Sequence, residues 1–310
     1  MDAGSEKRQL EERYGAWTAH NIRLGDGLYA LGPEPAGDEV KLRRVVQVVA
    51  DLFGRVEGLR VLDLACLEGM YAIELARRGA QAVAIEGREA NLEKARFAAR
   101  AVGVEVDFRQ GDVRDLSRAG HGEFDVVLCL GILYHLAAED VFPFVERMAE
   151  VCKRALVIDT AVSLSGKEEQ QHEGHAYSGE TLFEHDPDAS EEARLKAVWS
   201  SLDNPTAFAL TAPSLLRLLA RAGFTSVYQC WVPAEPGKTP DRVTLVALKG
   251  DPVDGLVTPA PPTGVDEVPE RPPLAATLPR SSMWKIARVA APRRLRRKLR
   301  QLLGAETRHH

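Results

Sequence analysis

Short apolar segments alternate with amphipathic segments between residues 60 and 159, and this alternation restricts the fold more than any other feature of the sequence. The apolar segments at 60–64, 82–86, 124–130 and 155–159 have the length and composition of strands buried on both faces, and a further strand is expected near 104–110. The segments between them repeat apolar residues at helical spacing, at 69–78, 89–102 and 139–152. We therefore expect an α/β fold with a mostly parallel sheet and helices on both faces.

Flanking segments complete the predicted sheet and divide the chain. Residues 37–53 and 214–224 have helical spacing, and "TSVYQCWV" and "RVTLVALK" read as a closing strand pair that gives the sheet an antiparallel end. Eight prolines between 251 and 280 are typical of an extended linker. The predicted parts are an N-terminal lead-in or cap (1–36), a main domain (37–250) with a polar lid inserted at 160–212, the linker (251–280) and a basic amphipathic tail (281–310).

The charge is distributed unevenly along the chain. The net charge is −5, but residues 281–304 contribute eight basic side chains and no acidic one, which leaves about −13 for the rest. Nucleic acid is therefore not an expected partner of the main domain, because phosphate contacts need a basic surface. The tail is either a contact for an anionic membrane or a protein partner, or a plain surface helix. The sequence does not fix the oligomeric state.

Two further features indicate a cytoplasmic protein. The N-terminal stretch "MDAGSEKRQLEERYG" has no basic segment followed by an apolar one, and no apolar run reaches the roughly 18–20 residues that span a bilayer. The cysteines lie far apart in apolar surroundings without a C-x-x-C pair, at Cys66, Cys129, Cys152 and Cys230. We expect them to be reduced core thiols.

The loop after the first strand, "ACLEG" at 65–69, keeps only Gly69 where a dinucleotide fold has three glycines. Glycines there let the backbone approach a pyrophosphate, so their loss argues against NAD or FAD. S-adenosylmethionine (SAM) has no phosphate, and its sulfonium and ammonium groups favour an acidic neighbour such as Glu68. Asp63, at the strand end, is expected to orient the loop or to accept from the cofactor's amine through water.

Residues 37–249 resemble the class I SAM-dependent methyltransferases, whose Rossmann-like fold and cofactor the resemblance implies. The family's motif D-x-G-x-G-x-G appears as "DLACLEG", and Glu86 follows Asp63 by 23 residues, which suits a carboxylate on the ribose hydroxyls. "GDVRDL" places Asp112 and Val113 at the adenine, and "FDVVLCLGILYHL" marks where cofactor meets acceptor. The expected cofactor-binding residues are Asp63, Ala65, Glu68, Gly69, Glu86, Gly87, Asp112, Val113 and Leu130.

Two branches of the family resemble particular stretches. "WTAHNIRLGDGLYALGP" and "GILYHL" are similar to the wobble-uridine tRNA carboxymethyltransferase-like proteins, in which the tyrosine matching Tyr134 lies against the cofactor. The acidic main domain disfavours tRNA, and a SAM-binding RNA- or membrane-associated protein that uses the basic tail stays as an alternative. Residues 204–211 resemble an N-P-x-S-F-W-P-T-like run of bacterial small-molecule methyltransferases, with Ala209 in place of a bulky aromatic residue, which implies a roomier pocket.

Within the small-molecule group, the chain resembles geranyl diphosphate C-methyltransferases of terpenoid secondary metabolism. This implies C-methylation of an isoprenyl diphosphate, farnesyl or geranyl, with Tyr134 or Phe208 stabilising a carbocation and Glu169 removing a proton. His172, His175 and Tyr177, with nearby arginines, would hold the diphosphate, together with Mg²⁺.

Other interpretations of the same residues stay open. His135 follows a strand and is either the base for O- or N-methylation of a natural product or sugar, or a hydrogen-bonded pocket histidine. The acidic run at 168–169 is also typical of a solvated lid helix. The pair His172 and His175 lacks clear further ligands, so we predict no definite metal site.

Overall fold

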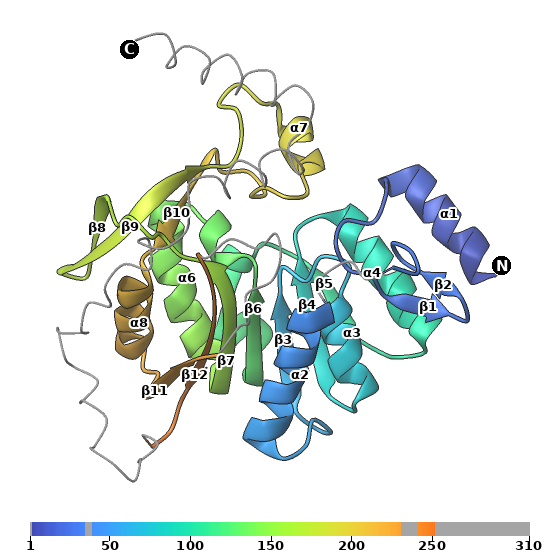
Figure 1. The fold of residues 1–310 in the computed structure, drawn as a ribbon, viewed down its shortest axis with the longest axis horizontal. Helices are drawn as coiled ribbons and strands as arrows, with labels where there is room; N and C mark the ends of the chain where they lie inside the picture. The colour runs from blue at the N-terminus through green and yellow to red at the C-terminus, as the bar shows by residue number, and fades with distance from the viewer. Residues whose placement is uncertain (1, 35–38, 231–240, 252–310) are drawn as a thin grey trace, which may run out of the picture. The chain divides into compact units, whose positions relative to one another are not determined.

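The computed structural model describes residues 2–34, 39–230 and 241–251, all within one compact unit of the chain. A seven-stranded sheet forms its centre, in the order β11-β12-β7-β6-β3-β4-β5 (Figure 1). Strands β3 to β7 are parallel, and β12 is antiparallel to both of its neighbours. The strands are β3 Arg60–Leu64, β4 Gln81–Glu86, β5 Asp107–Gln110, β6 Phe124–Leu130, β7 Cys152–Ala161, β11 Ser226–Gln229 and β12 Arg242–Leu248. The predicted mostly parallel sheet with an antiparallel end is confirmed.

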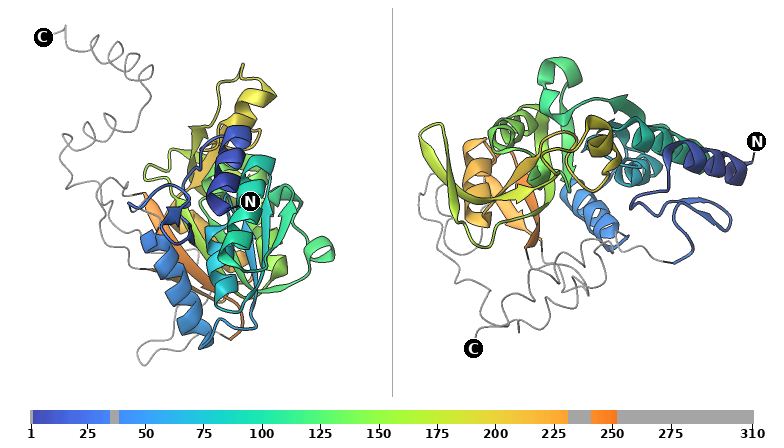
Figure 2. Two further views of the ribbon diagram at one scale, coloured as in Figure 1. Left: turned by 90° about the vertical axis from the view of Figure 1, so that its right-hand side faces the viewer. Right: turned by 90° about the horizontal axis from the view of Figure 1, so that it is seen from above.

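Helices cover both faces of this sheet. One layer is α2 Glu39–Phe53, α3 Met70–Arg77 and α4 Glu89–Val102, and the other is α5 Arg118–His121, α6 Ala138–Val151 and α8 Ala212–Arg221 (Figures 1 and 2). Successive strand residues point to opposite faces. Val61 therefore joins the core beneath α2–α4, whereas Leu62 joins the core beneath α6 and α8. Apolar runs without polar alternation are what this double burial requires.

The insertion at 160–212 contains regular structure that its sequence did not predict. Strands β8 Glu168–His172, β9 His175–Phe183 and β10 Thr206–Leu210 form a separate antiparallel sheet in the order β10-β9-β8. β10 is apolar and buried, and the Phe208 amide donates to the Leu136 carbonyl at 2.8 Å. β8 is polar and mostly exposed, so it carries no apolar periodicity. Residues 184–205, which join β9 to β10 and contain α7 Glu191–Lys196, are called the lid loop below (Figure 1).

The lead-in packs on the layer that contains α4. It consists of α1 Ala3–Tyr14 and a small hairpin of β1 Arg23–Gly25 and β2 Leu28–Tyr29. α1 lies beside α4 (Figure 2), where Glu6 pairs with Arg100 at 2.6 Å. The buried Lys94 of α4 donates to the Ala16 carbonyl at 2.7 Å. These contacts make residues 2–34 a cap on the domain.

Two further expectations concern the cysteines and membrane-spanning helices. All four cysteines are free, and Cys66, Cys129 and Cys152 are buried. Among the helices formed by the described residues, none is long and apolar enough to cross a membrane. The predicted linker and basic tail lie outside the described residues, apart from residue 251.

Gly179 in β9 is a close-packed point between the small sheet and the main core. A Cβ at this position would meet the Phe208 ring and would lie 2.6 Å from the Ala209 carbonyl oxygen. We expect Gly179→Ala to lower the free energy of unfolding by about 1–3 kcal/mol, because the neighbours are strand backbone and a buried ring. Urea unfolding measures this. Gly25→Ala is the control, since nothing lies within 4 Å of a Cβ there; equal stability of the two variants would contradict the prediction.

Candidate functional site

The loop between β3 and α3 has the backbone of a glycine-rich loop although it has only one glycine. Ala65 and Leu67 have φ angles of 52° and 47°, and Gly69 has a φ of 79°. A non-glycine residue in this left-handed region costs on the order of 1–3 kcal/mol, and such strain concentrates at functional sites. A Cβ on Gly69 would lie 3.0 Å from the Phe108 ring, so this position has a steric need for glycine as well.

Two buried carboxylates hold this loop in place. Glu86, at the end of β4, accepts hydrogen bonds from the Leu67 and Arg88 amides, both at 2.9 Å. Asp63 accepts from the Ala72 amide of α3 at 3.2 Å. Burial raises the pKa of Asp63 to about 7, and burial also raises the pKa of Glu86 against the opposing effect of the two amides. Carboxylates that are buried without a full counter-charge suit a ligand that brings a cation or hydroxyl donors.

Glu68 has a structural role that the sequence did not indicate. Its side chain is completely buried and accepts from the Thr18 amide at 2.5 Å, with His20 Nδ1 3.8 Å away. Its Oε2 has no hydrogen-bond partner among the described residues. Glu68 therefore bonds the lead-in to the loop. It does not line the hollow described next, so it is not placed to contact a cofactor bound there directly.

A hollow of about 60 Å³ lies at the carboxyl ends of the central strands. Its wall includes five of the predicted cofactor-binding residues, which are Ala65, Glu86, Gly87, Asp112 and Val113. The lid loop supplies the opposite wall with residues 200–204. The carboxyl ends of parallel strands are where open α/β sheets bind ligands. The other four predicted residues are not part of this wall; they are Asp63, Glu68, Gly69 and Leu130.

Asp112 is already engaged by a neighbouring arginine. Arg114 donates to Asp112 through its amide at 2.8 Å and through its guanidinium, and also contacts Asp203 of the lid loop at 2.7 Å. Although burial by itself would raise the pKa of Asp112, the hydrogen bonds from Arg114 hold it below the usual range. The Asp112 carboxylate is therefore ionised, and Arg114 fixes its orientation. The sequence predicted this residue as a contact for the cofactor's adenine.

His135 forms a pair with a carboxylate at the wall of the hollow. Its Nδ1 lies 2.8 Å from Glu184 Oε1, and Glu184 Oε2 accepts from the Ser201 amide at 2.6 Å. His135 is also one of the residues that line the hollow. A histidine oriented by a buried carboxylate is an arrangement suited to general base catalysis. Sequence reasoning missed Glu184, because 49 residues separate it from His135.

The predicted cation-stabilising aromatic residues do not offer free faces to the hollow. The Arg242 guanidinium lies 4.6 Å from the centre of the Tyr134 ring and donates to its hydroxyl at 2.9 Å. A carbocation beside this ring would face a positive charge. Phe208 is buried in the main core and, like Ala209, is not part of the wall. The structure thus gives no support to the expected roles of Tyr134, Phe208 and Ala209, which stay predictions.

The predicted base and diphosphate ligands lie elsewhere. Glu169 is exposed on β8 and accepts only from Gln171 among the described residues, at 2.9 Å. His172 pairs with Glu146 of α6 at 2.6 Å, and His175 is its partner across the β8–β9 hairpin. Tyr177 is buried against Phe142. None of the four predicted residues lines the hollow, because the small sheet directs them toward α6 or solvent; these are Glu169, His172, His175 and Tyr177.

One group of possible metal ligands occurs in the described part of the chain. The ligand atoms of Glu146, His172 and Glu173 lie within 4.8 Å of one another. The close His172–Glu146 contact accounts for the group as an ion pair, and Glu173 is exposed. It is remote from the hollow's wall and gives no support to a catalytic Mg²⁺.

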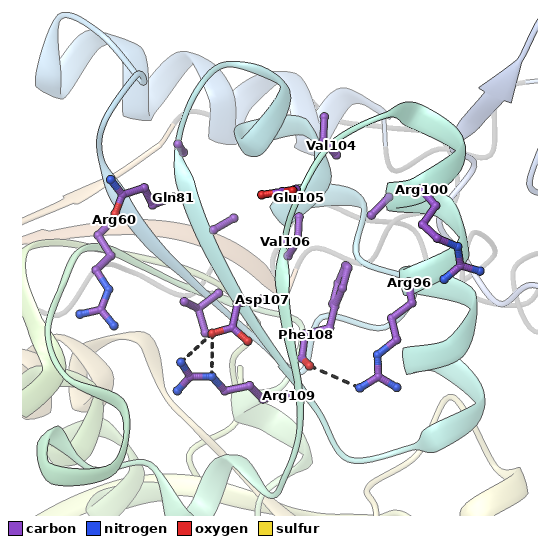
Figure 3. Close-up of a pocket in the computed structure, with 14 residues that line it drawn as sticks. Arg60, Gln81, Arg96, Arg100, Val104, Glu105, Val106, Asp107, Phe108 and Arg109 are labelled. Atoms are coloured by element: carbon purple, nitrogen blue, oxygen red, sulfur yellow. Dashed lines mark hydrogen bonds and ion pairs between the residues drawn. The ribbon is translucent and has the colours of Figure 1, made fainter.

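A larger hollow, of about 790 Å³, opens beside the edge strand β5 (Figure 3). It lies by the amino-terminal half of β4, away from the strand ends that carry the conserved chemistry of such sheets. Its arginines already have partners: Arg109 pairs with Asp107 at 2.6 Å, and Arg96 donates to the Phe108 carbonyl at 3.4 Å (Figure 3). We therefore place the functional site in the smaller hollow, where Glu86, Asp112 and His135 meet.

Comparison with known sequences finds a family match in the central part of the chain. The family described as "Methyltransferase domain" matches residues 61–155. Curated relatives include ubiquinone biosynthesis O-methyltransferases. That of Azorhizobium caulinodans is 37% identical over 128 residues (39% of this chain, 49% of the relative), and that of Alkalilimnicola ehrlichii is 41% identical over 121 residues (38% and 49%). The chain spans about half the length of these relatives.

Comparison with solved structures supports the fold over a longer stretch. The N-terminal domain of EvdMO1, determined in the presence of S-adenosylhomocysteine (SAH) and D-fucose, has a TM-score of 0.63 and 24% identity, covering 81% of this chain and 98% of that one. The same domain with SAH bound gives the same values. The fold is thus the Rossmann-like fold of class I methyltransferases, and residues 61–155 match the methyltransferase domain family.

Asp63 makes the stability of the protein depend on pH. Its folded pKa of about 7 exceeds the ordinary 3.8, so the folded state binds the proton more tightly and loses stability as pH rises between these values. Asp63→Asn should remove this loss, so the variant gains relative to wild type by up to about 4 kcal/mol across this range. Urea unfolding at several pH values measures the difference. A difference that stays constant across this pH range would contradict the prediction.

Proposed function

We propose that this chain is a SAM-dependent O-methyltransferase that methylates a hydroxyl group of a small molecule, with His135 as the general base. The observation that carries the proposal is the His135–Glu184 pair, 2.8 Å long, at the wall of the hollow that also contains Glu86 and Asp112. A base beside a cofactor site is what hydroxyl methylation needs, because a neutral hydroxyl is a weak nucleophile.

The residues of the hollow fit SAM. Ala65 of the loop at 65–69 lines the hollow, Glu86 is suited to ribose hydroxyls, and Asp112 is suited to the adenine amino group. SAM, when bound, supplies an electrophilic methyl group on a positively charged sulfur. Burial raises the pKa values of Asp63 and Glu86 although the nearby Lys41 and Arg88 act to lower them, and carboxylates buried in this way suit a ligand that brings a positive charge or hydroxyl donors.

His135 and Glu184 perform the proton transfer in this proposal. Glu184 accepts from Nδ1–H of His135, which leaves Nε2 unprotonated and able to accept. Nε2 takes the acceptor's hydroxyl proton as the oxygen becomes bonded to the methyl group. The carboxylate then stabilises the imidazolium that forms. The products are a methyl ether and SAH, with the proton carried by His135 until water removes it.

The comparisons favour a hydroxyl acceptor over the isoprenyl alternative. The curated relatives are named for O-methylation in ubiquinone biosynthesis, and one structural relative was determined with D-fucose present. The C-methylation hypothesis relied on Glu169 and on free aromatic faces, and the exposed position of Glu169 gives it no support. A tRNA substrate or membrane contact depends on the basic tail, which lies outside the described residues. We accordingly propose a phenol or a sugar hydroxyl as the acceptor.

The acceptor class can be tested directly. Purified protein with SAM should form SAH in the presence of a catechol-type phenol or a 6-deoxyhexose, measured by a coupled SAH assay and by mass spectrometry of the methyl ether. A product methylated on carbon, or turnover only with prenyl diphosphates, would reject the proposal.

Removal of the base should separate catalysis from cofactor binding. We expect His135→Ala to lower kcat by about 100-fold or more while SAH affinity changes little, because general base catalysis contributes on the order of 10²–10⁴. His175→Ala is the control, since His175 lies outside the hollow. Retained activity in His135→Ala would exclude His135 as the base.

The carboxylate partner should have a smaller effect. Glu184→Gln keeps the shape of the side chain but removes the charge that stabilises the imidazolium, so we expect kcat to fall by about tenfold or more. The KM for SAM should be less affected, because Glu184 does not line the hollow. Glu180→Gln, on strand β9 four residues before Glu184, is the control. Equal losses of kcat in the two variants, measured by steady-state kinetics, would indicate that the role of Glu184 is only structural.

A further inference from the structure

Arg88 connects the end of β4 to the lid loop. Its amide donates to Glu86 Oε1 at 2.9 Å, which places it beside the predicted ribose-binding carboxylate. Its guanidinium donates to four backbone carbonyls of the lid loop, those of Leu195 at 3.0 Å, Ala197 at 3.3 Å, Ser200 at 3.1 Å and Ser201 at 2.8 Å. A planar guanidinium can serve several acceptors at once, which an ammonium group cannot do with the same geometry.

These contacts hold the lid loop against the side of the hollow that Glu86 and Gly87 form, called the cofactor side below. A Cβ on Gly87 would lie only 3.0 Å from Leu202 Cδ2, so Leu202 is packed directly on the backbone that follows Glu86. The hollow that remains has a volume of about 60 Å³. Small-molecule sites usually offer roughly 300–1,000 Å³, so a molecule as large as SAM enters only when this loop moves back. That movement breaks or rearranges the Arg88 contacts.

The same loop also supports the catalytic pair. Ser201 is buried; its carbonyl accepts from Arg88, and its amide donates to Glu184 at 2.6 Å. Glu184 in turn holds His135 at 2.8 Å. Asn204 adds a second link, because its side-chain amide donates to the His135 carbonyl at 2.9 Å. One peptide segment therefore joins the cofactor side of the hollow to the base.

We propose that Arg88 is a positioning residue that holds the lid loop closed over the cofactor and, through Ser201, keeps Glu184 on His135. This rests on the proposed function, since it takes Glu86 to be at the cofactor's ribose. Entry of the cofactor separates the lid loop from Arg88, and closure restores the contacts and orients the base. Binding of the cofactor and assembly of the catalytic pair are thus coupled through this arginine.

The test compares Arg88→Ala and Arg88→Lys with wild type in two measurements. Stopped-flow binding of SAH should give association and dissociation rate constants that are both about tenfold faster in Arg88→Ala, because the loop opens without losing four hydrogen bonds. Trypsin should cleave after Arg194 or Lys196 in α7 faster than in wild type, with and without SAH. Arg88→Lys retains the charge and should be intermediate. Arg78→Ala, which removes a surface ion pair with Glu74, is the control.

The outcomes separate this inference from the proposed function. If wild type bound no SAH, the proposed function would fail, while the trypsin measurement on ligand-free protein would still decide the role of Arg88. SAH dissociation and α7 cleavage equal to wild type in Arg88→Ala would overturn the inference. A variant that was merely misfolded in part would have fewer active sites but an unchanged SAH dissociation rate constant. If Arg88→Ala does not fold, Arg88→Lys alone gives the same two comparisons.

Discussion

The buried carboxylate of Glu86 is the contact on which the rest of the site depends. One oxygen accepts from the Leu67 amide and thereby holds a loop whose residues Ala65 and Leu67 have left-handed backbones. The other accepts from the Arg88 amide and so directs the arginine that holds the lid loop. Since burial penalises this charge, the carboxylate is stable there only because backbone amides compensate. The loop, the arginine and the proposed ribose contact therefore share one side chain.

The insertion after β7 brings Glu184 to His135, the proposed base. β9 ends just before Glu184, and the pairing of β9 with β10 fixes that residue beside His135. The lid loop between those strands then returns through Ser201, whose amide and carbonyl bond to Glu184 and Arg88. The proposed base His135 follows strand β6 of the main sheet, whereas its partner Glu184 comes from the lid loop between two strands of the small sheet.

The sequence predicted correctly those elements whose local residue pattern fits only one structural environment. The apolar strands β3, β6 and β7 were predictable because burial on both faces leaves no polar position along them. Ala65, Glu86, Gly87, Asp112 and Val113 share the wall of one hollow because each lies at or shortly after the end of a strand. The sequence did not predict β8, whose polar, exposed residues have no apolar period, and the substrate residues assigned to the insertion do not line the hollow. Their roles were inferred from amino-acid type alone, and amino-acid type does not determine the direction in which a strand residue points.

By itself the sequence determined the α/β class, the position of the cofactor loop and His135 as a candidate base, because these depend on spacing along the chain. Only the tertiary structure decided that Glu184 is the partner of His135, that Arg242 covers Tyr134, and that Arg88 binds the lid loop. Each of these contacts joins residues 49 or more positions apart. Such pairs are set by strand register and loop packing in three dimensions, and a linear pattern carries no record of them.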